Sequence, residues 1–222
     1  MDFIFMLTRQ DQTVLDAIEV MAEIRPLGLK HIGFKDVGVD KPTLWALNQA
    51  IKTAGAISYM EVVSTSPEAA LQSARVAAEI GIDRLLGGTA VAEILAIVKA
   101  SAIAYYPFPG RPLGHPTKLG GTPEMVEAQC RQFLDMGCAG VDLLAYRATE
   151  ADPLDLVKAA RRGLGKKGGL ICAGSVDSPG RITELKAAGC DAFTIGSAAF
   201  DGSFSSRKGR LTSQLKDILA AC

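Results

Sequence analysis

The sequence predicts an α/β fold, a closed (β/α)8 TIM barrel formed by residues 1–222 as one domain. Short apolar runs alternate with longer amphipathic segments along the whole chain. Strands buried on both faces read as continuous apolar runs, and strands that alternate with helices pair in parallel through right-handed crossovers. An open doubly wound sheet is less consistent, because no Gly-x-Gly-x-x-Gly motif follows the first strand, where the sequence reads FMLTRQDQT.

The expected strands are short and rich in apolar or β-branched residues. They are residues 3–7, 31–34, 58–63, 84–86, 102–106, 140–144, 170–173 and 192–195. The expected helices show apolar residues at helical spacing between these runs. They are residues 11–23, 41–53, 67–80, 91–100, 123–136, 153–163, 179–188 and 210–221.

Punctuating residues support the helix boundaries. Several helices begin with proline directly after serine, threonine or aspartate, which suits an N-cap and a preset φ. Others end at a glycine typical of a helix C-cap: Gly55, Gly81, Gly137 and Gly189. The pattern STSPEAALQSARVAAEIGIDRLLGGTAV (64–91) also echoes SVDSPGRITELKAAGCDAFTIGSAAF (175–200), as a barrel of two related halves would.

Charge and composition narrow the functional classes. The 24 basic and 24 acidic residues balance, so neither nucleic acid nor an anionic membrane surface is expected as a partner. The MDFIF start lacks the basic and long apolar regions of a secretion signal, and no membrane span is apparent, so a cytoplasmic location is expected. The five cysteines form no CxxC pair and are expected to be reduced, with no metal site. A homo-oligomer is left open.

Two consecutive expected strands end in glycine and serine. Gly174-Ser175 follows the seventh strand, and Gly196-Ser197 follows the eighth. In a barrel these loops meet at the C-terminal face, where phosphate is often held. Glycine lets backbone N–H groups approach an anion, and serine adds a hydroxyl donor. The sequence therefore predicts one phosphate site shared by Gly174, Ser175, Gly196 and Ser197, although strand-to-helix turns often carry these residues for structural reasons.

The segment AGSVDSP…ELKAAGCDAFTIGSAAF resembles the ribulose-phosphate-binding barrels, and DRLLGGTAVAE (83–93) is similar to the fourth strand of the histidine-biosynthesis isomerase and cyclase barrels. The resemblance implies that Gly88 and Thr89 contribute to a second anion or substrate site. The catalytic aspartates of the histidine barrels are missing, since the first strand ends FMLTRQ and the fifth reads AIAYYPFPGRP. Their rearrangement chemistry is therefore not expected here.

Three charged residues are candidates for catalysis. Lys35 lies at the expected C-terminal end of the second strand and could polarise a carbonyl, stabilise an enolate or form an imine. Glu61 interrupts the apolar third strand, and its period-two position predicts that it points into the barrel toward Lys35. Asp142 has a similar position on the sixth strand. A structural ion pair is the alternative for each of them.

The loop after the fifth strand is long and dense in proline and glycine. It carries Arg111, His115 and Lys118 without acids nearby in the sequence, which is typical of a lid or binding loop over an anionic substrate. These three residues join Gly88 and Thr89 as candidates for the second site. Asp177 is expected to cap the following helix.

These patterns together favour an enzyme acting on a small phosphorylated, sugar-like metabolite by acid–base chemistry next to a carbonyl. The reaction would be an isomerisation or a carbon–carbon lyase reaction, with no cofactor and no metal implied. A synthase or transferase using a phosphorylated substrate in the same barrel is one alternative. A non-catalytic protein that binds a phosphorylated metabolite is another.

Overall fold

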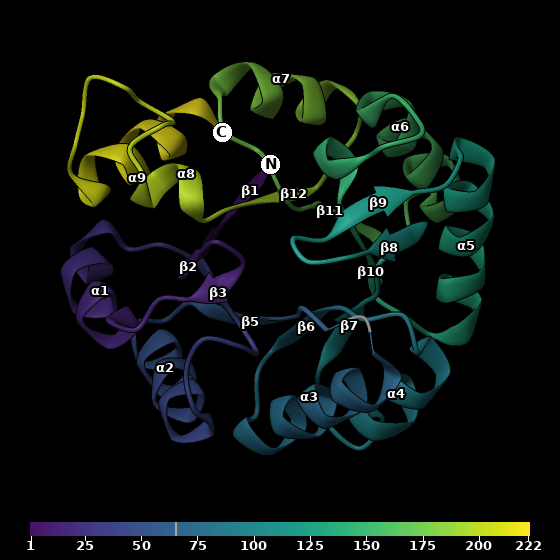
Figure 1. Cartoon of the computed structure of the whole chain (residues 1–222), viewed down its shortest axis with the longest axis horizontal. Helices are drawn as coiled ribbons and strands as arrows, with labels where there is room; N and C mark the ends of the chain where they lie inside the picture. The colour runs from purple at the N-terminus through teal and green to yellow at the C-terminus, as the bar shows by residue number, and fades with distance from the viewer. Residues whose placement is uncertain (65) are drawn as a thin grey trace.

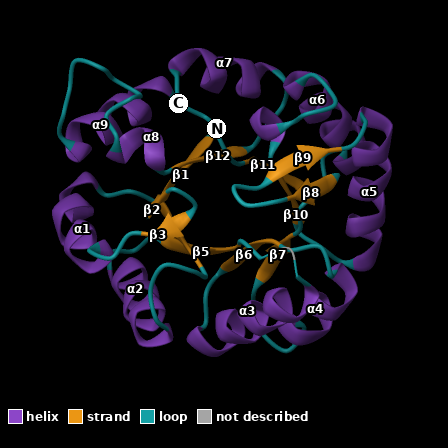
Figure 2. Cartoon of the chain, viewed as in Figure 1, coloured by secondary structure: helices purple, strands orange, loops and turns teal. Residues whose placement is uncertain are grey.

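A computed structural model describes residues 1–64 and 66–222. Eight parallel strands form one sheet that curls into a barrel, and the helices lie outside it (Figures 1 and 2). In sheet order the strands are β10 (Gly140–Leu143), β11 (Gly169–Cys172), β12 (Ala192–Ile195), β1 (Asp2–Met6), β4 (His31–Lys35), β5 (Ile57–Val62), β6 (Arg84–Gly87) and β7 (Ala104–Tyr106). The predicted (β/α)8 barrel is confirmed.

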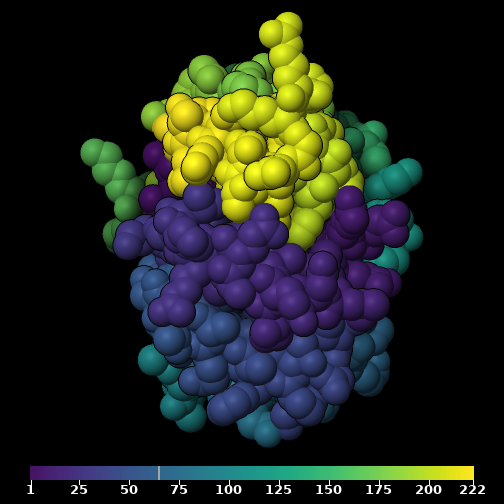
Figure 3. Space-filling view, turned by 90° about the vertical axis from the view of Figure 1, so that its left-hand side faces the viewer, coloured from purple at the N-terminus to yellow at the C-terminus, as the bar shows by residue number. Residues whose placement is uncertain are grey.

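Two backbone hydrogen bonds close the barrel between β7 and β10. The amide of Ala139 donates to the carbonyl oxygen of Tyr105 at 2.9 Å, and that of Asp142 donates to Pro107 at 3.0 Å. The first and last strands pair directly, with Phe3 opposite Phe193. This pairing brings the C-terminal residues against the N-terminal ones, as the contact of yellow and purple surfaces in Figure 3 shows.

The helices follow the strands along the chain. They are α1 (Ala17–Ile24), α2 (Lys41–Thr53), α3 (Pro67–Ile80), α4 (Val91–Val98), α5 (Pro123–Met136), α6 (Pro153–Leu164), α7 (Pro179–Ala187), α8 (Ser197–Phe200) and α9 (Leu211–Ala221), with 3-10 turns η1 (Arg25–Leu27) and η2 (Ala145–Arg147). The predicted caps hold for α3, α5 and α6, where the side chains of Ser66, Thr122 and Asp152 accept hydrogen bonds from first-turn amides. Gly81 and Gly137 end α3 and α5 with φ of 72° and 100°.

Two predictions of local structure are wrong. A helix was expected from residue 11, but residues 8–13 form a hairpin of β2 (Thr8–Arg9) and β3 (Gln12–Thr13), and α1 begins at Ala17. The long segment after β7 is not a simple loop, since β8 (Arg111–Leu113) and β9 (Lys118–Gly120) form a second antiparallel hairpin. Both hairpins follow barrel strands at their C-terminal ends and lie near the barrel mouth (Figure 1).

Apolar side chains form two layers, one inside the barrel and one around it. One cluster lies inside the barrel and comprises Ile4, Met6, Tyr59, Leu86, Tyr106, Ile171 and Ala192. A larger cluster lies between the sheet and the helices. Because alternate strand residues point to the same side, Glu61, two positions after Tyr59 of the inner cluster, points into the barrel nearer its C-terminal end. Lys35 lies opposite Glu61 in the strand register, and Asp142 is fully buried on β10.

The N-terminal end of the barrel holds a polar network around His31. His31 Nδ1 lies 2.9 Å from the hydroxyl oxygen of Tyr59, which accepts a hydrogen bond of 2.8 Å from Arg84. His31 Nε2 lies 3.5 Å from Asp2 Oδ2. A neutral imidazole suits this site, because its Nδ1 can accept the Tyr59 proton. Burial lowers the pKa of His31, and Arg84 adds to this effect while Asp2 opposes it.

We expect this network to make stability fall in mild acid. The folded protein resists protonation of His31 while the unfolded chain protonates it near pH 6.5, so stability is complete above that pH and falls as the pH drops below it. His31→Gln should lack this component, because glutamine does not titrate. Urea unfolding of both proteins between pH 5 and 8 measures it, and parallel pH profiles would contradict the assignment.

Candidate functional site

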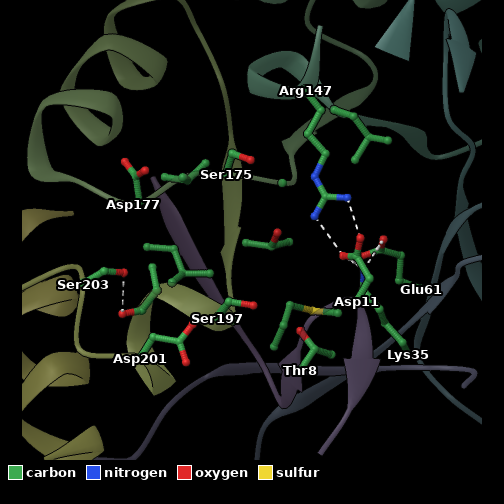
Figure 4. A pocket seen from close by; sticks show the side chains of 18 residues that line it. Thr8, Asp11, Lys35, Glu61, Arg147, Ser175, Asp177, Ser197, Asp201 and Ser203 are labelled. Atoms are coloured by element: carbon green, nitrogen blue, oxygen red, sulfur yellow. Dashed lines mark hydrogen bonds and ion pairs between the residues drawn. The ribbon is translucent and has the colours of Figure 1, made fainter. Parts of the chain in front are cut away.

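A cavity of about 300 Å³ opens at the C-terminal ends of the barrel strands. Figure 4 shows that it joins a charged end to a hydroxyl-rich end. Its lining includes Thr8, Asp11, Lys35, Glu61, Arg147, Gly174, Ser175, Asp177, Thr194, Gly196, Ser197, Asp201 and Ser203. The cavity therefore brings together two of the three predicted catalytic residues and all four predicted phosphate-binding residues.

Lys35 is the central cation of the charged end. It ends β4, only 5% of its surface is exposed, and its Nζ lies 2.7 Å from Asp11 Oδ1 and 3.1 Å from Glu61 Oε1. Burial by itself would lower the pKa of Lys35, but the charges of Glu61 and then Asp11 outweigh it, and the pKa lies above its usual value. The ammonium form therefore dominates at neutral pH. This form can stabilise an oxyanion, whereas imine formation needs the neutral amine.

The β2–β3 hairpin holds the Lys35 backbone in place. The hydroxyl of Thr13 donates to the carbonyl oxygen of Lys35 and accepts from its amide, both at 2.8 Å. The same hairpin delivers Asp11, whose φ is 60°, next to Gln10 at 49°. Two successive positive φ values are typical of a tight type I′ turn, and non-glycine residues there are strained. Such strain is common at functional sites.

Asp11 is the functional candidate that the sequence reading missed. An acid was expected only directly at the end of the first strand, whereas the hairpin folds Asp11 back over the barrel mouth. The signal that could have revealed it is the polar segment TRQDQT between β1 and α1, which offers strand and turn residues rather than a helix pattern.

Arg147 is the second missed residue, since the sequence reading assigned it no role beyond the rim. It ends η2 after β10, and its Nη1 and Nη2 each lie 2.8 Å from a different carboxylate oxygen of Asp11. Burial would raise the pKa of Asp11, but these hydrogen bonds and then the Lys35 ammonium outweigh it and hold the pKa well below its usual range. Asp11 is thus a stable carboxylate between two cations.

Glu61 and Asp142 point into the barrel, as their positions predicted. Glu61 lines the cavity and contacts Lys35. Asp142 is fully buried beneath it and does not line the cavity. Neither carboxyl oxygen of Asp142 has a hydrogen-bond partner among the described residues. Burial and then the Glu61 charge raise the pKa of Asp142 well above its usual value, so the site favours the protonated carboxyl over the carboxylate.

The two Gly-Ser loops lie at the other end of the cavity. Ser175 and Gly174 both have positive φ, 59° and 77°. A Cβ on Gly174 would lie 2.5 Å from Arg147 Nε, and one on Gly196 would overlap Thr8. A larger residue at either position would clash with neighbouring protein atoms, so packing within the protein requires both glycines. The sequence suggested a different reason, which was close approach of the backbone to an anion.

Two carboxylates lie at the edge of this end. Asp201 Oδ1 lies 2.6 Å from Arg9 Nε, and Asp177 Oδ2 lies 2.8 Å from Arg181 Nη1. The prediction that Asp177 caps the helix is wrong, because Ser178 holds the N-cap position and the Asp177 carboxylate pairs with Arg181 in the first turn of α7. Each acid has an arginine partner, so neither places an unpaired negative charge beside the two serines.

The cavity lining does not include the residues of the expected second anion site. Gly88 is buried, with its Cβ position facing Ile94 and Tyr105, and Thr89 is exposed. His115 and Lys118 are exposed on the β8–β9 hairpin. Arg111 has no acid near it in the sequence, but the fold pairs it with a distant one, since its Nη2 lies 2.6 Å from Glu150.

The echo between the two halves also stops at this point. Gly88 has a φ of 75°, whereas Gly196 has a φ of −124°, so the matching sequences do not form the same turn.

The β8–β9 hairpin contacts the site through its backbone, because Arg147 Nη1 donates to the carbonyl oxygen of Thr117 at 3.3 Å.

Gly174→Ala is expected to disturb Arg147. The positive φ alone should cost about 1–2 kcal/mol, as it should in Gly28→Ala, where φ is 62° and no atom crowds the Cβ position. Displacing Arg147 from Asp11 should cost about 1.5–3 kcal/mol more. Urea unfolding of both variants measures the difference, and equal losses would show that Arg147 does not depend on Gly174.

Within residues 1–64 and 66–222, no three His, Cys, Asp or Glu side chains converge in a way that could hold a metal ion. In the same part of the chain, no helix is long and apolar enough to cross a membrane.

Solved structures with the same fold are known at low sequence identity. Orotidine 5′-phosphate decarboxylase from Pyrococcus horikoshii OT3 is 13% identical, with a TM-score of 0.67 over 99% of this chain and 98% of that one. A 3-hexulose-6-phosphate synthase is 15% identical, with a TM-score of 0.67 over 100% and 99%. A mandelate oxidase variant is 12% identical, with a TM-score of 0.66 over 98% of this chain and 71% of that one.

These similarities show the fold alone. No protein-family model matches the sequence, and no curated protein is significantly similar to it. The structures named above support a general (β/α)8 barrel and give no support to the narrower resemblance to the histidine-biosynthesis barrels.

Proposed function

We propose that this protein is an enzyme that acts on a small phosphorylated, sugar-like substrate by proton transfer next to a carbonyl group. The observation that carries the proposal is the buried Lys35 ammonium, which lies between two carboxylates at the floor of a cavity whose other end is formed by both Gly-Ser loops. Two of the similar structures are enzymes named for phosphorylated compounds, which supports the substrate class.

The phosphate group would bind between Gly174-Ser175 and Gly196-Ser197. Within residues 1–64 and 66–222, the backbone amides of Ser175 and Val176 donate to no protein acceptor, so they are free for an anion. The hydroxyl groups of Ser175 and Ser197 add further donors. A cavity of about 300 Å³ suits a small metabolite, at the lower end of the usual range for ligand pockets.

Lys35 and Glu61 would carry out the reaction. The carbonyl oxygen of the substrate would face the Lys35 ammonium, and Glu61 would remove a proton from the neighbouring carbon. The electrons of that C–H bond form the carbon–carbon double bond of an enolate, and Lys35 stabilises the negative oxygen. The hydroxyl proton on that neighbouring carbon then passes to the enolate oxygen, which leaves the negative charge on the second oxygen of an enediolate. Return of the proton from Glu61 to the former carbonyl carbon, as the second oxygen becomes the new carbonyl, completes an isomerisation.

A carbon–carbon lyase reaction uses the same groups in a different order. Glu61 removes the proton of the hydroxyl group on the β-carbon, and that carbon becomes a new carbonyl. The bond between the α- and β-carbons breaks, and its electron pair forms the same enolate beside Lys35. The site supports both reactions, because both place developing charge on one oxygen. Asp11 orients Lys35 and stays ionised, and Asp142, which does not line the cavity, would not touch the substrate.

A synthase remains the second candidate. The 3-hexulose-6-phosphate synthase among the similar structures is named for making a sugar phosphate, and an enolate held at Lys35 could equally attack a second carbonyl compound. A binding protein without catalysis is a weaker candidate, because it would not need Lys35 and Glu61 buried at the floor of the cavity.

Thermal shift with phosphorylated three- to six-carbon sugars, and with inorganic phosphate as competitor, tests the substrate class. A ligand at one hundred times its dissociation constant should add about 2.7 kcal/mol of stability. Ser197→Asp should abolish this stabilisation, because it places a carboxylate at the phosphate position. Stabilisation that persists in Ser197→Asp would place the phosphate elsewhere.

Glu61→Gln tests the chemistry separately. For a sugar phosphate that stabilises the protein, the variant should keep the thermal shift but lose proton transfer by about 10²–10⁴-fold. NMR in D₂O measures this step, as exchange of the substrate α-proton for an isomerase or synthase and as appearance of the cleaved products for a lyase. Stabilisation without exchange or product formation by the unmodified protein would favour the binding protein.

A further inference from the structure

Arg147 connects the two ends of the cavity. Its side chain extends beside Ser175 and reaches Asp11, as Figure 4 shows. The contact is close, because a Cβ on Gly174 would lie 2.5 Å from Nε and 2.8 Å from Cδ of Arg147. The guanidinium group therefore lies beside the proposed phosphate position while both of its Nη atoms are committed to Asp11.

Asp11 does not need Arg147 to remain paired. Its Oδ1 also accepts a hydrogen bond of 2.7 Å from Lys35 Nζ. If Arg147 turns away, Asp11 keeps one cation partner, and Lys35 keeps both of its carboxylates. A phosphate, in turn, is a strong bidentate partner for a guanidinium group. The geometry thus offers Arg147 two competing anions on opposite sides.

We propose that Arg147 is an anion-dependent switch that holds Asp11 in the empty protein and turns to the phosphate of the bound substrate, leaving Asp11 to Lys35. The inference rests on the phosphate site of the proposed function and adds to it a binding residue and a coupling between the two ends of the cavity. Substrate binding would then release one carboxylate of the charged end at the time the substrate arrives.

The release of Arg147 would change the basicity of Asp11. While Arg147 holds Asp11, its two hydrogen bonds are the main cause that lowers the pKa of the Asp11 carboxylate. Without them Asp11 becomes a better proton acceptor beside the substrate. The protein would therefore keep a weak base when empty and gain a stronger one only when a phosphorylated ligand fills the cavity.

Affinity for inorganic phosphate, measured by calorimetry, tests the switch. Asp11→Asn removes the competitor for Arg147 and should tighten phosphate binding. Glu61→Gln is the matched control, because it removes an equal negative charge and also leaves Lys35 with one carboxylate, but it does not contact Arg147. We expect Asp11→Asn to tighten binding about tenfold more than Glu61→Gln, which corresponds to about 1.4 kcal/mol.

Arg147→Gln completes the comparison. It should weaken phosphate binding, and in its presence Asp11→Asn and Glu61→Gln should have equal effects. Equal tightening by the two acid variants with Arg147 intact would overturn the switch while leaving the phosphate site in place. Absence of Ser197-dependent phosphate binding in the unmodified protein would instead overturn the phosphate site of the proposed function.

A crystal structure of the unmodified protein with phosphate gives a test that needs no variant. The two distances of 2.8 Å from Arg147 to Asp11 should exceed hydrogen-bonding range when phosphate occupies the loops. Bound phosphate with the Arg147–Asp11 pair unchanged would overturn the proposal, even if Asp11→Asn does not fold.

Discussion

Lys35→Met is expected to lower the free energy of unfolding by about 3–5 kcal/mol at neutral pH. The methionine side chain fills a similar volume, so the loss would come mainly from electrostatics. Asp11 and Glu61 are both buried, with 7% and 6% of their surfaces exposed, and they share Lys35 as a cation. Removing that cation leaves Glu61 without its ion-pair partner at the floor of the cavity, where little of its surface is exposed. Urea unfolding measures the loss.

Lys41→Met is the matched control. Lys41 pairs with Glu79 at 2.5 Å, but both side chains are about half exposed, at 48% and 62%. Exposed pairs of this kind contribute about 0–1 kcal/mol. Adding Glu61→Gln to Lys35→Met should recover part of the loss, because it removes the unpaired carboxylate. A loss in Lys35→Met no larger than that in Lys41→Met would contradict the buried ion network and the role proposed for Lys35.

Asp142→Asn is expected to stabilise the protein increasingly as the pH rises above about 4. The folded-state pKa of Asp142 lies well above 3.8, because the carboxyl group is fully buried without a hydrogen-bond partner in the described residues. Below that pH the group is protonated in both states and makes no pH-dependent contribution. Above it the unfolded chain ionises while the folded protein keeps the proton, so stability falls by up to about 1.4 kcal/mol per pH unit.

Asparagine removes this fall, since it is neutral at every pH. The difference in unfolding free energy between Asp142→Asn and the unmodified protein should therefore grow from pH 4 until the folded-state pKa is reached. Chemical unfolding at pH 4, 5, 6 and 7 measures it. A difference that does not change with pH would show that Asp142 is not held in its protonated form.

Asp83 supplies a control of opposite sign. Burial would raise the pKa of Asp83, but hydrogen bonds from the amide and hydroxyl of Ser58 outweigh it and lower the pKa. Its contribution to stability is complete above 3.8 and is lost as the pH falls through the folded-state pKa. Asp83→Asn should therefore be destabilising, most of all above pH 4.

Local patterns predicted the framework of the barrel well. Continuous apolar runs indicated the strands, and Ser66, Thr122 and Asp152 marked helix starts because a cap depends only on a few neighbouring residues. The alternation of side chains along β5 also predicted that Glu61 points inward toward Lys35, and the 3.1 Å contact confirms that placement. The catalytic roles themselves stay predictions.

Patterns of this kind failed where the chain folds back on itself. Asp11 follows the first strand by several residues and reaches Lys35 only because the β2–β3 hairpin returns it to the barrel mouth. Arg111 forms an ion pair with Glu150 on the surface, although no acid is near it in sequence. Neither contact has a local signal, because each depends on the position of a second segment.

The sequence by itself determined the alternation of strands and helices, the loops at which the chain turns, and the charged residues that interrupt apolar strands. These features depend on the spacing of residues that are close together in the sequence, so they can be recognised without the tertiary structure. Only the tertiary structure decided that Arg147 crosses Gly174 to hold Asp11, and that Asp142 lies beneath the cavity rather than in it. The physical reason is that closing the barrel sets the distances between side chains from separate strands and loops, and those distances set their charges and partners.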